Sequence, residues 1–220
     1  MARISNSPTV ASNVLAGAAL AGVVEPHASI GVLAIAMVAF YTAGMLLNDV
    51  CDYGWDRQHR PDRPLVVGAV SRQVALAVTI GLFVVSEALL WLVGPRAFAA
   101  GIVLIGVIVL YDVWHKTNPL SPLVMAGCRL MVYVTAFVAF VWPPTLVLAI
   151  GGGALVLYLV AVTAIAKRGA GGAVVAPLLA GISLLDALVL VVMQAPLPWV
   201  GVAVLCFGLT LFLQRYVEGT

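Results

Sequence analysis

The sequence predicts an all-α integral membrane protein, a single bundle of about eight transmembrane helices formed by residues 1–220. Of the 220 residues, 63% are hydrophobic and only 9% are charged, whereas a soluble domain carries roughly 25% charged residues. Apolar stretches of the length needed to cross a hydrocarbon core recur along nearly the whole chain. These stretches are continuous and do not alternate with polar residues, which argues against membrane β-strands.

In the first half of the chain, breaks in the apolar runs set the expected helix ends. Glu25-Pro26 separates the first run from the second, and Pro95 separates the third from the fourth. Proline ends a helix because it lacks the backbone N–H that the next turn needs. A polar segment at 48–72 follows the second run. The four expected spans are residues 9–24, 29–47, 74–93 and 98–114.

The second half divides in the same way. Asn118-Pro119, Pro143-Pro144, Gly171-Gly172 and the prolines at 196–198 interrupt the apolar runs. The four expected spans are residues 120–141, 146–166, 174–193 and 199–216. Four of the five tryptophans lie near span ends, as in the aromatic belts of membrane proteins.

The basic residues predict the orientation. With eight spans, both termini and the loops after the second, fourth and sixth spans share one side. That side carries nine of the 11 basic residues: Arg3, Arg57, Arg60, Arg63, Arg72, Lys116, Lys167, Arg168 and Arg215. The positive-inside rule therefore predicts a bacterial-type inner (plasma) membrane protein with both termini in the cytoplasm. The net charge of +2 is too small to indicate nucleic acid as a partner.

The polar segment 48–72 carries four of the nine acidic residues. If the second helix continues into it at 100° per residue, Asn48, Asp49, Asp52 and Asp56 share one face. Clustered carboxylates repel one another unless a cation neutralises them, and oxygen ligands together with substrate phosphates suit Mg²⁺. We therefore predict that these four residues bind Mg²⁺. A solvated acidic helix end and a cation or proton pathway are the alternatives.

Each cytoplasmic loop brings basic side chains to the same side as the carboxylates, as a diphosphate site requires. The predicted diphosphate ligands are Arg63, Lys116, Arg129, Lys167 and Arg168. The predicted catalytic residues are Asp49, Asp52, Asp56 and Lys116, and the predicted cavity residues are Asn13, Tyr111, Asp112 and Tyr133. Glu87 and Asp186, also at membrane depth, are expected to pair structurally with a hydroxyl or a cation.

The segment 48–56, NDVCDYGWD, resembles the NDxxDxxxD signature of the UbiA prenyltransferase superfamily. Arg63-Pro64-Leu65 with Gly68 and Ser71 is similar to the continuation of that signature, and Tyr111 with His115-Lys116 to the end of its fourth span. The Tyr111-Asp112 and Cys128-Arg129 pairs resemble a short bacterial branch, the EboC-like proteins.

This resemblance implies a UbiA-like central cavity and transfer of a prenyl group from a prenyl diphosphate to a small acceptor, with Mg²⁺ as cofactor. The acceptor is aromatic in most members, and an alcohol or cyclitol is open for this branch. A UbiA-type terpene cyclase shares the ionisation step and is one alternative. A small cation-coupled membrane transporter is another, although no second copy of the acidic cluster is present.

The sequence departs from the superfamily in one respect. The loop after the sixth span, residues 166–172, has no acidic residue where the family has a second aspartate motif. We expect Lys167 and Arg168 to replace the charge of the second metal ion by direct contact with the diphosphate. The alternative is a protein that binds prenyl diphosphate without using it.

Overall fold

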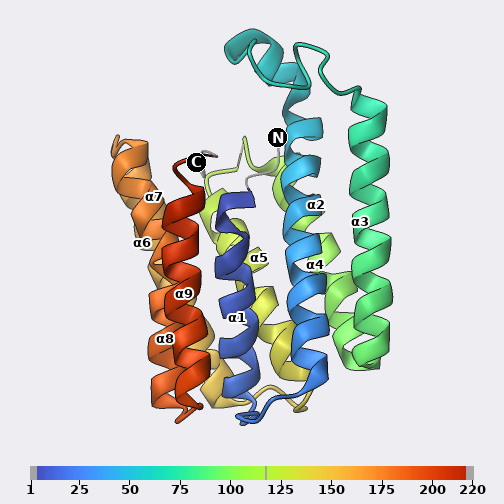
Figure 1. Cartoon of the computed structure of the whole chain (residues 1–220). Helices are drawn as coiled ribbons and strands as arrows, with labels where there is room; N and C mark the ends of the chain where they lie inside the picture. Colours follow the sequence, from blue (N-terminus) through green and yellow to red (C-terminus); the bar gives the residue numbers. More distant parts are fainter. Residues whose placement is uncertain (1–3, 117, 217–220) are drawn as a thin grey trace.

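The computed structural model describes residues 4–116 and 118–216, and all regular elements in these residues are helices. The elements are η1 (Ile4–Asn6), α1 (Ser7–Leu20), α2 (Ala28–His59), α3 (Arg72–Val93), α4 (Pro95–Trp114), α5 (Ser121–Val138), α6 (Leu146–Lys167), α7 (Gly172–Ala180), α8 (Ile182–Val192) and α9 (Leu197–Leu213). Helices α7 and α8 are two halves of one span, interrupted at Gly181. The described chain therefore forms the eight helical rods that the sequence predicts, packed as one bundle (Figure 1).

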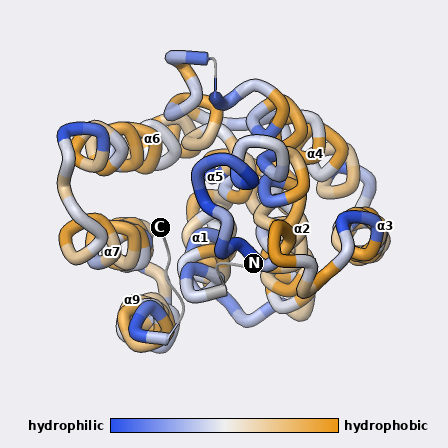
Figure 2. Tube along the Cα trace, turned by 90° about the horizontal axis from the view of Figure 1, so that it is seen from above, coloured by the Kyte–Doolittle hydropathy of each residue, from blue (hydrophilic) through white to orange (hydrophobic). Residues whose placement is uncertain are grey.

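Two of the eight rods are shorter than a membrane span. Six are long and apolar enough to cross, namely α2 to α6 and the rod formed by α7 and α8, whereas α9 has 17 residues and α1 has 14. The expected first span, 9–24, is too long: α1 ends at Leu20, and Gly22 follows it with a φ of 78°, a left-handed conformation that suits glycine at a helix end. Ten of the 14 residues of α1 are buried, because neighbouring helices and not lipid surround it (Figures 1 and 2).

Helix α2 is the longest element and carries the aspartate cluster. Its 32 residues correspond to a length of about 48 Å, and its C-terminal part rises above the other helices in Figure 1. The assumption that the second helix continues through Asn48–Asp56 is thus correct. The polar connection is shorter than the expected 48–72, since it is non-helical only at 60–71.

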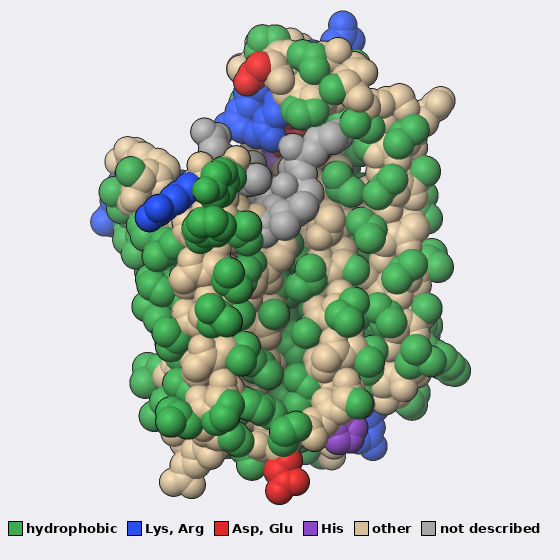
Figure 3. Space-filling view, viewed as in Figure 1, with side chains coloured by type: hydrophobic (Ala, Val, Ile, Leu, Met, Phe, Trp, Pro, Cys, Tyr) green, Lys and Arg blue, Asp and Glu red, His purple; other side chains and the backbone are tan. Residues whose placement is uncertain are grey.

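The outer surface of the bundle is apolar, as lipid contact requires. Exposed large hydrophobic side chains occur on α3, α4, α6, α8 and α9, and Figure 3 shows charged side chains gathered at the two ends of the visible face. Together with the six candidate spans, this surface defines an integral membrane protein. Helix α1 begins and α9 ends at the same end of the bundle as the aspartate cluster (Figure 1), where Gln214 Nε2 donates to Asn6 Oδ1 at 3.0 Å. Arg3, one of the nine basic residues, lies outside the described residues.

A fully buried polar cluster joins α1, α5 and α8. The Asp186 carboxylate accepts hydrogen bonds from Ser12 Oγ at 2.5 Å, Tyr133 Oη at 2.5 Å and Asn13 Nδ2 at 2.9 Å. Arg129 Nη1 donates to Asn13 Oδ1 at 3.1 Å. Asp186 thus has the hydroxyl partners that the sequence predicts for it. Such pairing is needed because an unsatisfied polar group in an apolar interior costs several kcal/mol.

Asn13 and Tyr133, which the sequence predicts as cavity residues, are both 0% exposed and bond to Asp186. Their polar groups satisfy the buried carboxylate. Glu87 was expected to have a structural partner, yet neither of its carboxyl oxygens has a hydrogen-bond partner among the described residues. It packs instead against Gly101 of α4.

Helices α1 and α5 approach closely at Gly17. A Cβ atom at this position would lie 2.8 Å from both Ala136 Cβ and the Tyr133 carbonyl oxygen. Small residues allow this approach, which membrane helices use because no hydrophobic force joins them.

We expect Gly17→Ala to destabilise the bundle by about 1–3 kcal/mol, the usual cost of overpacking, because the backbone of α5 cannot yield as a side chain can. Gly31→Ala in α2 is the matched control, since a Cβ there has no neighbour within 4 Å. Thermal unfolding in detergent measures both. Equal melting temperatures for the two variants would contradict the close packing of α1 on α5.

Candidate active site

A polar pocket of about 250 Å³ lies at the C-terminal part of α2. Its lining residues are Asn48, Asp49, Asp52, Trp55, Asp56, Arg60, Arg63, Tyr111, His115 and Lys116. All four residues of the predicted magnesium site thus line one pocket with Arg63, Lys116 and Tyr111. Helical periodicity places the acidic residues together, because positions four apart on an α-helix lie on the same face.

Two of the three carboxylates in this pocket are paired with basic side chains from other segments. Asp52 Oδ1 lies 2.7 Å from Lys116 Nζ and 3.5 Å from His115 Nε2, both directly after α4. Asp49 Oδ1 lies 3.4 Å from Arg63 Nη1, from the connection to α3. The negative wall formed by α2 therefore faces a positive wall built by residues distant in sequence.

Trp55, Arg60 and His115 also line the polar pocket, although the sequence analysis did not assign them to the site. The Trp55 ring lies close to two cations: Lys116 Nζ is 4.6 Å and Arg60 Cζ is 5.8 Å from the ring centroid. Such cation–π contacts fix the basic groups at the rim of the pocket. The sequence contains two signals that could have assigned Trp55 and His115 to the site. Trp55 lies three residues after Asp52 and so shares its helix face, and His115 directly precedes Lys116.

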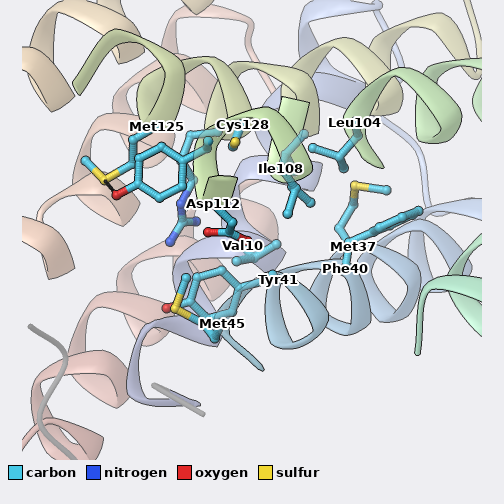
Figure 4. A pocket seen from close by; sticks show the side chains of 14 residues that line it. Val10, Met37, Phe40, Tyr41, Met45, Leu104, Ile108, Asp112, Met125 and Cys128 are labelled. Carbon is cyan, nitrogen blue, oxygen red and sulfur yellow. Dashed lines mark hydrogen bonds between the residues drawn. The ribbon is translucent and has the colours of Figure 1, made fainter. Parts of the chain in front are cut away.

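A second pocket, of about 100 Å³, lies deeper between α1, α2, α4 and α5. We call it the apolar pocket. Its lining residues are Val10, Met37, Phe40, Tyr41, Gly44, Met45, Leu104, Ile108, Tyr111, Asp112, Met125, Cys128, Arg129 and Val132. Tyr111 lines both pockets. Figure 4 shows Asp112 among the labelled side chains that these four helices contribute.

Three predicted diphosphate ligands do not line the polar pocket. Arg129 lines the apolar pocket. Lys167 and Arg168 are exposed at the end of α6, and Figure 2 shows the ends of α6 and α2 on different sides of the bundle, with α1 and α5 between them. The structure thus separates these two cations from the aspartate cluster, because α6 packs on α5 and not on α2.

The donor set of the polar pocket fits Mg²⁺ bound together with a phosphate ligand. Among the described residues, no three His, Cys, Asp or Glu side chains converge on a point that could hold a metal ion. Mg²⁺ needs only one or two carboxylates when substrate phosphates supply further oxygens. Asp49, Asp52 and Asp56, in a pocket that also presents Arg and Lys donors for phosphate, provide such a set. This arrangement favours Mg²⁺ bound together with a phosphate ligand over Mg²⁺ bound by the side chains of Asn48, Asp49, Asp52 and Asp56 alone.

The fold and this pocket define a membrane-embedded helical protein with a charged site at one end of the bundle. The sequence matches the UbiA prenyltransferase family over residues 10–219. The chain therefore belongs to the UbiA prenyltransferase family.

Curated relatives match parts of the chain. A digeranylgeranylglyceryl phosphate synthase of Methanoregula boonei is 38% identical over 88 residues, which are 40% of this chain and 32% of that protein. A 2-acylphloroglucinol 4-prenyltransferase of Humulus lupulus is 29% identical over 134 residues, 54% of this chain and 32% of that protein. The matched segments span about a third of the length of these relatives.

Solved structures share the fold over nearly the whole chain. A UbiA homologue from Aeropyrum pernix K1, in the apo form, has a TM-score of 0.68 and 18% identity, covering 99% of this chain and 97% of that one. A UbiA homologue from Archaeoglobus fulgidus bound to DMAPP and Mg²⁺ has a TM-score of 0.59 and 15% identity, covering 98% and 86%. At these identities the likeness establishes the fold.

If the polar pocket binds a magnesium diphosphate, Mg²⁺ with inorganic pyrophosphate will raise the melting temperature of the purified protein. Ligand at 100 times its Kd stabilises the folded state by about 2.7 kcal/mol. Asp52→Asn will remove most of this shift, whereas Asp62→Asn, at an exposed residue outside the pocket, will keep it. The same shift in both variants would contradict a site at Asp52.

Proposed function

We propose that this protein transfers a prenyl group from an isoprenyl diphosphate to a small acceptor within the membrane, with Mg²⁺ as cofactor. One observation carries the proposal: a pocket with carboxylates on one wall and cations on the other adjoins an apolar pocket, and Tyr111 lines both. This arrangement matches a substrate with a charged head and an apolar chain. Two further observations support this proposal: the chain belongs to the UbiA prenyltransferase family, and the names of two relatives describe a digeranylgeranylglyceryl phosphate synthase and a 2-acylphloroglucinol 4-prenyltransferase.

The polar pocket receives the diphosphate in this proposal. Asp49, Asp52 and Asp56 would hold Mg²⁺, which supplies positive charge to the phosphate oxygens. Lys116 donates to the diphosphate as negative charge develops on it, which lowers the barrier to cleavage of the allylic C–O bond. Lys116 Nζ lies 2.7 Å from Asp52 Oδ1, so Lys116 is positioned within the polar pocket where the diphosphate would bind.

Arg60, Arg63 and His115 take the role that we first expected of Lys167 and Arg168. All three line the polar pocket. Arg60 and Arg63 bring positive charge to the side of the bundle that holds the single aspartate motif, and His115 brings a ring nitrogen that can donate a hydrogen bond. In proteins with two aspartate motifs, the second motif and its metal ion supply net positive charge to the diphosphate. Basic side chains can supply the same charge without a metal ion. We therefore propose that one aspartate motif is sufficient here.

The apolar pocket is where the allylic carbon and the acceptor meet in this proposal. When the C–O bond breaks, its electron pair leaves with the diphosphate, and the acceptor attacks C1 and loses a proton. Walls such as Phe40, Leu104 and Ile108 exclude water, which would otherwise capture the carbocation.

We also propose membership of the EboC-like branch, supported by the Asp112 and Arg129 positions in this pocket.

Purified protein in nanodiscs, supplied with geranyl diphosphate, Mg²⁺ and a panel of aromatic, alcohol and cyclitol acceptors, will release pyrophosphate and form a prenylated acceptor. Asp56→Ala will abolish turnover, and Lys116→Met will lower it about 10²- to 10³-fold, as loss of one charged donor does. The Lys167→Ala/Arg168→Ala double variant is the matched control and will keep turnover within a few fold. A rearranged hydrocarbon in place of prenylated acceptor would identify a cyclase, and cation-driven flux without diphosphate cleavage a transporter.

We propose that the aspartate end of the bundle faces the cytoplasm, supported by the distribution of basic residues. In a variant whose native cysteines are replaced, Ala69→Cys lies in the exposed connection between α2 and α3, and Arg96→Cys lies at the start of α4. An impermeant thiol reagent added to sealed cells will label the second and not the first. Labelling of Ala69→Cys from outside would reverse the orientation.

A further inference from the structure

The apolar pocket contains an aspartate and an arginine side chain whose polar groups a hydrocarbon chain cannot satisfy. Asp112 is 4% exposed, and its Oδ1 accepts a hydrogen bond from Asn48 Nδ2 at 3.1 Å. Its Oδ2 has no hydrogen-bond partner among the described residues. A buried carboxyl oxygen without a hydrogen-bond partner destabilises the folded protein. A ligand with a hydroxyl group would satisfy it.

Arg129 enters the same pocket from α5 and is held from behind. Its Nη1 donates to Asn13 Oδ1 at 3.1 Å, and Asn13 Nδ2 in turn donates to both carboxylate oxygens of Asp186 at 2.9 Å. The guanidinium carbon lies 5.2 Å from the centroid of the Tyr41 ring. A guanidinium has five N–H donors, and the described residues use one in a hydrogen bond. The group is therefore fixed while retaining donors for a ligand.

We propose that Asp112 and Arg129 are the specificity-determining residues that bind the acceptor, which is a small hydroxylated molecule. A hydroxyl of the acceptor donates to Asp112 Oδ2, and a second oxygen of the acceptor accepts from Arg129. This inference rests on the proposed function and reassigns Arg129 from the diphosphate to the acceptor.

The position of Asp112 links the two substrates. Asn48 lies in the polar pocket and donates to Asp112 in the apolar pocket. An acceptor bound to Asp112 thus lies directly next to the aspartate cluster, where the allylic carbon would lie. A prenyl chain in this position would leave the polar groups of Asp112 and Arg129 that face the pocket without hydrogen-bond partners. The geometry therefore favours the acceptor, not the chain, beside these two side chains.

The test separates acceptor binding from diphosphate binding in the full-length protein in nanodiscs. Calorimetry measures the Kd of geranyl diphosphate with Mg²⁺, and product formation measures the acceptor KM. The acceptor probes are 4-hydroxybenzoate, phloroglucinol, glycerol 1-phosphate and inositol, and benzoate is the matched compound without the hydroxyl. The variants are Asp112→Asn, Arg129→Lys and, as a control at the far end of α4, Arg96→Gln.

We expect at least one hydroxylated probe to be prenylated and benzoate not to be. Asp112→Asn and Arg129→Lys will each raise the KM of that acceptor about 10- to 100-fold, as loss of a hydrogen bond to a charged group does. The Kd of geranyl diphosphate will stay within about twofold of the wild-type value. Arg96→Gln will change neither quantity. Asp112→Asn is nearly isosteric, and Arg129→Lys keeps the charge beside Asp186, so both should fold.

Several outcomes would overturn the inference. One is loss of geranyl diphosphate binding in folded Asp112→Asn or Arg129→Lys, which would place these residues at the diphosphate. Others are an unchanged acceptor KM, prenylation of benzoate, or a wild-type protein that binds geranyl diphosphate but prenylates none of the four hydroxylated probes. A wild-type protein that does not bind geranyl diphosphate with Mg²⁺ would instead refute the proposed function on which the inference rests.

Discussion

The organisation of this protein follows from one constraint: a polar group inside a lipid-embedded bundle must find its partner within the protein. The few polar side chains at membrane depth are therefore concentrated. The Asp186 cluster satisfies one carboxylate with Ser12, Asn13 and Tyr133 and so ties α8 to α1 and α5. Asp49, Asp52 and Asp56 gather in the C-terminal part of α2, where basic residues that follow α2 and α4 line the same pocket.

Extension of α2 beyond the other helices gives the carboxylates their position. The helix needs about 20 residues to cross the hydrocarbon core, and its 32 residues leave the last turns for a polar site. Its motif then lies above the apolar interior while remaining rigidly attached to it. A charged head and an apolar chain can thus be bound by one continuous wall, with Tyr111 at the boundary.

The buried cluster and the proposed site are physically connected. Asp186 orients Asn13, Asn13 holds Arg129, and Arg129 reaches the apolar pocket. On the other side, Asn48 joins the aspartate motif to Asp112. Stability and substrate recognition therefore share residues, and a variant of Asn13 would affect both.

The sequence by itself determined the fold class, the eight rods and the shared face of Asn48, Asp49, Asp52 and Asp56. Hydropathy and helical periodicity are local properties, and they suffice for these conclusions. Tertiary structure alone decided which distant cations reach the carboxylates: it brought Lys116, His115 and Arg63 to the pocket and kept Lys167 and Arg168 away. It also placed Asn13 and Tyr133 against Asp186. Periodicity orients a residue on its own helix, whereas the packing of helices around one another decides what that face meets.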